Sequence, residues 1–338
     1  MVRTTRGPTM ITLYSPQGVR TASLADLTAG TLPGVLWIDL LDPTPEEIAA
    51  VERLEELSLP TRNEAQEIEI SSRLYIENRT LFMTATIMVR ATHANPGTTP
   101  VTFVYRAGRL LTLRFDTPAP FQSYALRFER NPEAAPSAQT VFLGLFDDVV
   151  DRIADILEFV AADLSDLSNA IFTGESREPG TVNYNDLLRR IGQGAARTSN
   201  ARESLVSLRR VHGFFTETCG KVSAESVDEH WRITGKDVIA LADHANFISS
   251  KVTFLLDATL GLINSEQNTI NSQQNRIIKL FSVLAVVLLP PTLVASIYGM
   301  NFRHMPELEW RWGYPIALVL MLVSAVVPYL IFKFKRWL

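Results

Sequence analysis

The stretch LFSVLAVVLLPPTLVASIY, residues 280–298, and the stretch YPIALVLMLVSAVVPYLIF, residues 314–332, each contain nineteen residues and no charged side chain. A helix of that length rises about 28 Å, which is close to the roughly 30 Å thickness of the hydrocarbon core of a bilayer. A buried helix of a soluble protein would rarely lack charge for so long. We therefore predict two transmembrane helices at these positions.

Basic residues flank the predicted spans on one side. Arg276 and Lys279 precede the first span, and the tail at residues 333–338 contains two lysines and an arginine. The loop between the spans, residues 299–313, balances two arginines against two glutamates. Because Lys and Arg are retained on the cytoplasmic side, we predict a multi-pass protein with both termini in the cytoplasm.

The overall composition argues against several classes of protein. Of 338 residues, 46% are hydrophobic and 20% are charged, with a net charge of −4. That balance is untypical of nucleic-acid-binding or disordered chains. The single cysteine, Cys219, cannot form an intrachain disulfide. The sequence also contains no phosphate-binding loop and no recognisable catalytic triad, so we expect no nucleotide or nucleic-acid partner and no enzymatic activity.

The residues before the spans divide into three predicted regions. Short β-branched and aromatic runs predict an α/β domain over residues 1–136, and apolar residues at three-to-four spacing predict a helical layer over residues 137–234. A third helix is expected to start near Gly235, and no Gly-Pro break separates it from the first span. Residues 235–279 therefore predict a stalk helix that continues into the membrane, and the predicted fold is that of an α+β membrane protein.

Local signals predict some elements of the N-terminal domain. The sequence TPEE at residues 44–47 predicts a capped helix start. Pro118 and Pro120, and then residues 131–136, are interpreted as the exit from the domain. The strand candidates are residues 10–14, 35–40, 73–77, 81–90, 101–106 and 110–115.

Uncharged polar residues around the first span share one helical face. Asn275, Ser282, Thr292 and Ser296 lie within an arc of about 100° on a helical wheel. Polar groups are costly against lipid, so this face should meet protein or water. Helix packing through small polar residues and the lining of an aqueous pore both fit this pattern. Because two helices cannot enclose a channel, a pore would need several chains around an axis.

Four motifs follow one another toward the C-terminus. They are YGMN at residues 298–301, MPEL at residues 305–308, WGYP at residues 312–315 and KRWL at residues 335–338. With these motifs the chain strongly resembles the CorA magnesium transporters, particularly the proteobacterial type. The resemblance implies a homopentameric channel in the lipid bilayer of the cell inner membrane. It further implies uptake of Mg²⁺, and also of Co²⁺ and Ni²⁺, down the membrane potential.

The resemblance also implies roles for individual residues. Gly299, Met300 and Asn301 would form the selectivity filter, with Glu307 in the outer loop. Taken together with the polar face, it gives a set of pore-lining residues: Asn275, Ile278, Phe281, Ser282, Leu289, Thr292 and Ser296. Amide oxygens suit an ion that loses its water reluctantly, because they can accept hydrogen bonds from its hydration shell.

Regulation is implied by the same resemblance. Mg²⁺ bound at acidic residues between cytosolic subunits would gate the channel, and Asp237 and Asp243 are the candidates here. One departure concerns the outer loop, where Arg303 and then His304 occupy a site at which related sequences commonly carry an acid. The loop of this chain is therefore close to neutral.

Two other functions compete with magnesium transport. Zinc-transporting relatives share the GMN motif but usually lack MPEL, so residues 305–308 favour magnesium. A membrane-anchored helical scaffold or signalling protein would need neither the polar face nor the GMN loop.

Overall fold

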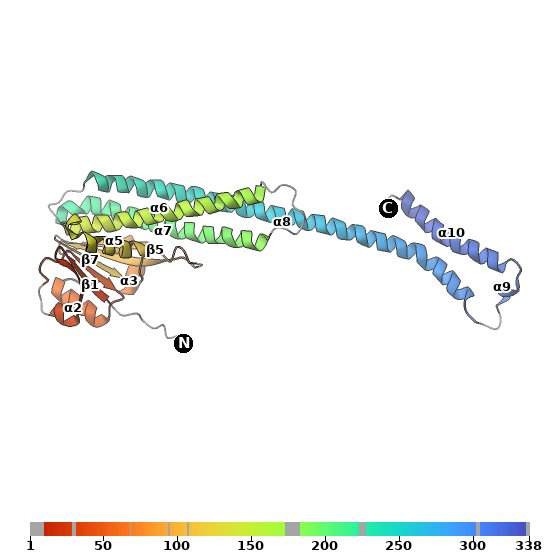
Figure 1. Cartoon of the computed structure of the whole chain (residues 1–338), viewed down its shortest axis with the longest axis horizontal. Helices are drawn as coiled ribbons and strands as arrows, with labels where there is room; N and C mark the ends of the chain where they lie inside the picture. Colours follow the sequence, from red (N-terminus) through yellow and green to blue (C-terminus); the bar gives the residue numbers. More distant parts are fainter. Residues whose placement is uncertain are drawn as a thin grey trace. The chain divides into compact units, whose positions relative to one another are not determined.

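The computed structural model places the strand-forming residues in one seven-stranded sheet of order β2-β1-β3-β7-β6-β5-β4 (Figure 1). Neighbouring strands are antiparallel except β3 and β7, which are parallel. The strands are β1 (Met10–Ser15), β2 (Gly18–Ala22), β3 (Trp37–Leu41), β4 (Leu74–Glu77), β5 (Thr80–Val89), β6 (Gly97–Arg106) and β7 (Arg109–Arg114). The hairpin strand β2 was missing from the expected set.

The structure describes residues 10–28, 32–67, 69–93, 95–106, 108–172, 183–222, 228–301 and 305–335. The chain divides into two units, the first ending at Thr259 and the second beginning at Leu260.

The sheet has an apolar core on each face, because alternate residues of a strand point to opposite sides. In β3, Ile38 and Leu40 join a cluster with Ala50 and Val51 of helix α2 (Pro45–Glu55). Trp37 faces the other way and joins the core formed with the long helices. Every residue of β5 is buried.

Short helices complete the N-terminal part. They are α1 (Leu24–Thr28), α2, α3 (Arg62–Gln66), α4 (Ile70–Arg73) and α5 (Ala119–Arg130), followed by a 3₁₀ turn at Pro132–Ala134. The predicted cap of α2 is confirmed: the Glu47 N–H donates to Thr44 Oγ1 at 3.2 Å, and the Thr44 N–H donates to Glu47 Oε2 at 2.8 Å. Pro118 is the N-cap residue of α5 and Pro120 lies in its first turn, where proline is favoured.

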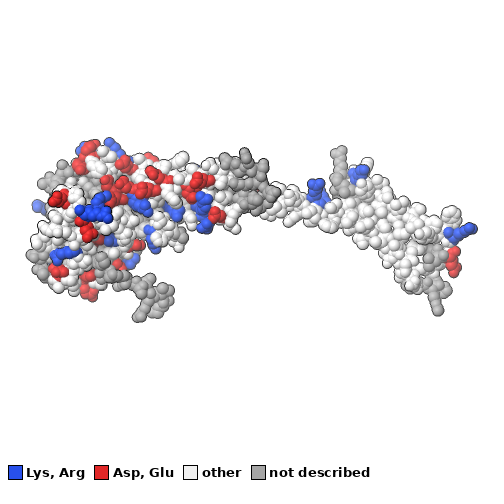
Figure 2. Space-filling model, viewed as in Figure 1, with Lys and Arg blue, Asp and Glu red and all other residues white. Residues whose placement is uncertain are grey.

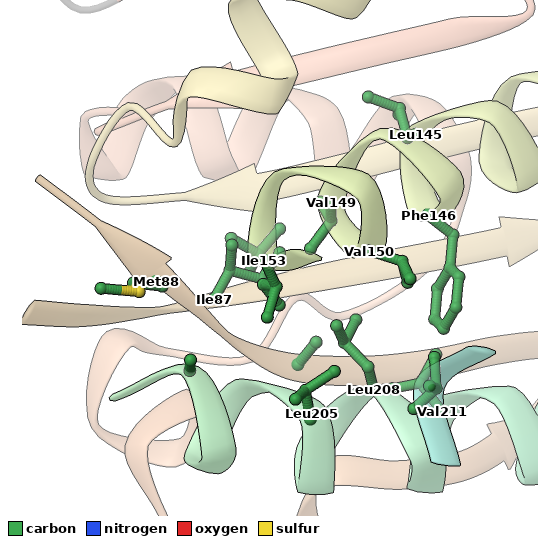
Figure 3. Packing of buried hydrophobic residues seen from close by; sticks show 14 of the residues in the cluster. Ile87, Met88, Leu145, Phe146, Val149, Val150, Ile153, Leu205, Leu208 and Val211 are labelled. Carbon is green, nitrogen blue, oxygen red and sulfur yellow. The ribbon is translucent and has the colours of Figure 1, made fainter. Parts of the chain in front are cut away.

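Three long helices cover one face of the sheet: α6 (Ala138–Phe172), α7 (Tyr184–Val222) and the first part of α8 (Glu229–Tyr298). Figure 3 shows Val149, Val150 and Ile153 of α6 beside Leu205 and Leu208 of α7. The α8 residues Trp231, Val238, Ile248 and Leu255 belong to the same cluster. This packing fixes the N-terminal third of α8 against the sheet-bearing unit.

Helix α8 begins at Glu229, earlier than the start expected near Gly235. Asp228 precedes it and accepts the Trp231 N–H at 2.9 Å, which satisfies a backbone donor of the first turn. Gly235 serves packing instead, because a Cβ atom there would lie 2.3 Å from the His212 ring. A glycine in a helix can therefore mark a close approach as well as a boundary.

The second unit contains the rest of α8, the short α9 (Pro306–Glu309) and α10 (Gly313–Phe334). Among the described residues, α8 and α10 are the two helices long and apolar enough to cross a membrane. In the most apolar stretch of each helix only 6% is buried inside the chain, whereas a core helix of a soluble protein would be mostly covered. Figure 2 shows charged side chains gathered on the first unit and few along these helices.

Candidate ion pathway

One face of the C-terminal part of α8 is partly covered. Half-buried residues recur on it every three or four positions: Val283, Val287, Pro290, Pro291, Val294 and Tyr298. Helix α10 runs back antiparallel to this part of α8 within the second unit (Figure 1). It carries its own covered stripe of mostly small residues, including Gly313, Ala317, Ser324 and Ala325. Small residues at this spacing allow close approach of two helices in a membrane.

The predicted pore-lining residues occupy the opposite face of α8. Asn275, Ile278, Phe281, Ser282, Leu289, Thr292 and Ser296 are all exposed. The centre of this set lies about 170° round the helix from the centre of the covered stripe. Exposure is high even for the apolar members, at 65% for Leu289 and 61% for Ile278. This face is therefore left uncovered by the described parts of the chain.

The hydroxyl of Thr292 is oriented by its own helix. Thr292 Oγ1 donates to the carbonyl oxygens of Leu288 and Leu289, each at 2.8 Å. Its proton is used inside the helix, so its lone pairs remain for partners on the exposed face. An oxygen in that state can accept hydrogen bonds from the water shell of a cation.

Two prolines lie inside α8 on its partly covered side. Pro290 and Pro291 lack the N–H groups that would bond to the carbonyls of Val286 and Val287. The helix nevertheless continues to Tyr298. Both prolines are thus kept off the predicted pore face.

The predicted filter begins where α8 ends. The Gly299 N–H donates to the Ala295 carbonyl at 2.9 Å, and the Met300 N–H donates to the Ile297 carbonyl at 3.3 Å. Asn301 follows the last helical turn and is exposed. Glu307 lies in α9, but its side chain falls outside the described part of the structure, as do Arg303 and His304. The end of a rigid helix therefore positions the Asn301 backbone.

The two candidate regulatory acids are both exposed on α8, in the first unit. Asp237 lies near a row of acids on α6 that the sequence reasoning did not single out. Burial raises the pKa of Asp151, and the charges of Asp147, Asp148, Asp155 and Asp237 raise it further. The spacing of Asp147, Asp151 and Asp155, four residues apart, was a readable signal for this row. Among the described residues, no three His, Cys, Asp or Glu side chains of one chain are grouped to hold a metal.

Asp147 also links α6 to the start of α8. Its carboxylate accepts hydrogen bonds from His230 and from the Thr234 hydroxyl, the latter at 2.7 Å. The hydrogen bond and charge of Asp147 raise the pKa of His230. These contacts hold the first turns of α8 to α6.

Comparison with known proteins gives consistent matches along nearly the whole chain. The profile of the family described as "CorA-like Mg2+ transporter protein" matches residues 33–336. The magnesium transport protein CorA of Pectobacterium atrosepticum is 36% identical over 313 residues, which is 93% of both chains. The magnesium transport protein CorA of Escherichia coli K12 is 33% identical over 329 residues, covering 97% of this chain and 100% of that protein.

A solved structure gives the same architecture. The complete CorA magnesium transporter from Methanocaldococcus jannaschii superposes with a TM-score of 0.61 at 17% identity, covering 98% of this chain and 100% of that one. At this identity the likeness concerns the fold. It confirms the predicted combination of an α/β sheet domain, long helices and two C-terminal apolar helices.

Proposed function

Because this chain belongs to the CorA family of Mg²⁺ transporters, we propose that several copies of α8 line a pore that admits Mg²⁺ to the cell. Members of this family are membrane transport proteins and not enzymes. One observation carries the proposal. The polar face of α8 is exposed and lies opposite the face of this helix whose residues are half-buried. Copies arranged around an axis would turn the open face inward and present α10 to lipid.

We propose a homopentamer in the inner membrane, with both termini in the cytoplasm. The basic flanks of the two spans support that orientation. In it, an inside-negative potential drives entry, because a divalent cation gains about 4.6 kcal/mol per 100 mV. Uptake then needs no nucleotide. The proposed boundaries are a cytosolic α/β domain to residue 136, a helical layer to residue 234 and a stalk to residue 279, ahead of the spans.

The filter would recognise Mg²⁺ through its water. Gly299 and Met300 would hold a ring of Asn301 amides at the outer mouth, and Glu307 would lie in the loop beside it. Amide oxygens accept from a hydrated ion without binding it as tightly as carboxylates, so the ion can leave. Farther in, Asn275, Ser282, Thr292 and Ser296 would offer further acceptors. Ile278, Phe281 and Leu289 would form apolar constrictions that close when water leaves them.

Ion preference is the part of the proposal open to the most direct experiment. We expect liposomes containing the protein and an Mg²⁺-sensitive dye to show uptake driven by an inside-negative potential, with Co²⁺ and Ni²⁺ also entering. Zn²⁺ should enter poorly, and a proton gradient should not change the rate. Zn²⁺ uptake stimulated by protons would favour the zinc transporter. No ion flux from correctly assembled protein would favour the scaffold.

Gating by cytosolic Mg²⁺ is proposed from the acids of the first unit. Mg²⁺ held between neighbouring subunits would offset the repulsion of their carboxylates and favour a closed ring, to the extent that it binds this state more tightly. We expect millimolar Mg²⁺ to slow proteolysis of the stalk and to inhibit current. Asp237→Ala/Asp243→Ala should weaken both effects.

A matched control for that experiment is Asp257→Ala, which removes an exposed acid from the same helix. It should keep the full response to Mg²⁺. If the double variant at Asp237 and Asp243 also keeps it, these acids are not the sensor. If the wild-type protein responds to Mg²⁺ in neither measurement, the gating proposal fails while the transport proposal stands.

A further inference from the structure

A cleft of about 460 Å³ lies on the first unit, between α7, β5 and the end of α4. It is separate from the predicted ion pathway, which belongs to the second unit. Three arginines line it, Arg73 from α4 and Arg202 and Arg210 from α7. Glu203 is the one acid in the lining, so the cleft carries two net positive charges.

The lining residues from α7 follow a helical pattern. Ser199, Arg202, Glu203, Val206, Ser207 and Arg210 are spaced by three or four residues and therefore share one face of the helix. Arg209 is adjacent in sequence but lies outside this lining. The positive charge thus belongs to a particular face of α7.

Two hydroxyl groups in the lining of the cleft, those of Thr86 and Ser207, each accept a hydrogen bond from the chain. The Thr86 N–H donates to Ser207 Oγ at 2.8 Å, and Arg73 Nη1 donates to Thr86 Oγ1 at 3.0 Å. Both hydroxyls are buried, and each already accepts one bond. Neither hydroxyl proton has an acceptor within the described parts of the chain. Both protons are therefore available to a ligand that accepts hydrogen bonds.

Arg73 is held in place without a neutralising carboxylate. Its guanidinium donates to the backbone carbonyls of Glu67 and Gln66, the latter at 3.5 Å. Among the described residues, no Asp or Glu lies within ion-pair distance of Arg73, Arg202 or Arg210. A half-buried cation without a directly paired carboxylate is costly, and an anion from solution would reduce that cost.

The charged groups of the cleft act on one another. Burial lowers the pKa of Arg73, the negative charge of Glu203 raises it, and the positive charge of Arg210 lowers it. Arg73, Glu203 and Arg210 are therefore close enough for the charge of each to affect the others. Arginine forks match phosphate oxygens in bidentate geometry, and hydroxyl donors complete such sites.

We propose that this cleft binds a small soluble anion bearing phosphate groups, held by Arg73, Arg202 and Arg210 and by the hydroxyls of Thr86 and Ser207. The volume admits more than one phosphate group, and the two net positive charges favour a polyvalent ligand. Val206 is the one apolar residue among those described in the lining, so the cleft offers little surface to an acyl chain, and a soluble anion is the ligand rather than a lipid headgroup. The inference stands independently of the proposed ion transport.

The test measures binding of pyrophosphate to the full chain in a non-ionic detergent by isothermal titration calorimetry. Mg²⁺ is removed with a chelator, because pyrophosphate would otherwise bind it. We expect saturable binding of pyrophosphate at least tenfold tighter than that of sulfate at the same ionic strength. Arg202→Gln/Arg210→Gln should weaken pyrophosphate binding at least tenfold. Arg209→Gln, the matched control on another face of α7, should change it less than twofold.

Four results would overturn the proposal. The first is absence of saturable pyrophosphate binding to the wild-type protein at millimolar concentration. The second is equal weakening by Arg209→Gln, which would indicate general surface charge. The third is a double variant that binds normally but no longer assembles, which would assign the arginines to a subunit contact. Vesicles with phosphatidic acid serve as the lipid arm, and binding to them alone would also contradict a soluble ligand.

Discussion

Asn301→Ala should reduce Mg²⁺ uptake into liposomes to the level of protein-free vesicles. Asn301 follows the last turn of α8 and is exposed there, so its amide is available at the proposed outer mouth. Alanine removes the oxygen that would accept hydrogen bonds from the hydrated ion, at the same position in every subunit. No other side chain at that ring would then accept hydrogen bonds from the water molecules around the ion.

The matched control is Asn246→Ala, which changes an exposed asparagine of α8 in the first unit. It should leave the rate of uptake unchanged. Both variants should elute at the wild-type size in detergent, because neither side chain is packed in the core. Wild-type uptake by a correctly assembled Asn301→Ala protein would remove Asn301 from the filter.

Asp39→Ala should destabilise the first unit by about 3–5 kcal/mol, which is the typical cost of leaving one partner of a buried ion pair alone. Asp39 and Arg114 are 3% and 7% exposed, and Arg114 Nη2 donates to Asp39 Oδ2 at 2.7 Å. Asp39 Oδ1 also accepts from the Thr112 hydroxyl at 2.7 Å, and Thr112 Oγ1 accepts from Trp37 Nε1 at 2.8 Å. The change would break a network that joins β3 to β7 at their parallel pairing.

Thermal unfolding of the full chain, followed by circular dichroism, measures this loss. The control is Asp155→Ala, an exposed acid whose partner Arg152 lies 3.8 Å away. Exposed pairs contribute little, so its melting temperature should stay close to that of the wild-type protein. Equal melting temperatures for Asp39→Ala and wild type would show that the buried network does not limit stability.

Local signals in the sequence were sufficient for several elements. The TPEE motif predicted the cap of α2 because its hydrogen bonds involve only neighbouring residues. The membrane helices were predictable because nineteen uncharged residues have few alternatives in water. The helix α5 was not predicted, although Pro118 and Pro120 lie at its start, because proline occurs both where a helix ends and in its first turn. The role of Gly235 depends on His212, which is distant in sequence.

The candidate site was predictable only as a face of a helix. The wheel grouped Asn275, Ser282, Thr292 and Ser296, but it could not indicate which side of α8 is exposed in the folded chain. That information comes from the exposure of the side chains in the structure. The acids of α6 and the arginine cleft were not predicted, because Asp237 meets Asp151, and Arg73 meets Arg210, only after folding.

Because α8 is continuous from its Asp228 cap to Tyr298, it restricts which insertions and deletions the chain can accept between these residues. An α-helix advances 100° per residue, so the number of residues between two positions of α8 fixes the angle between their side chains about the helix axis. One residue inserted between Thr259 and Asn275 would rotate the proposed pore face by about 100° relative to the part of α8 before it. Seven inserted residues would restore its azimuth to within about 20°. Viable changes in this segment should therefore preserve the helical phase, as insertions of about seven, eleven or eighteen residues do.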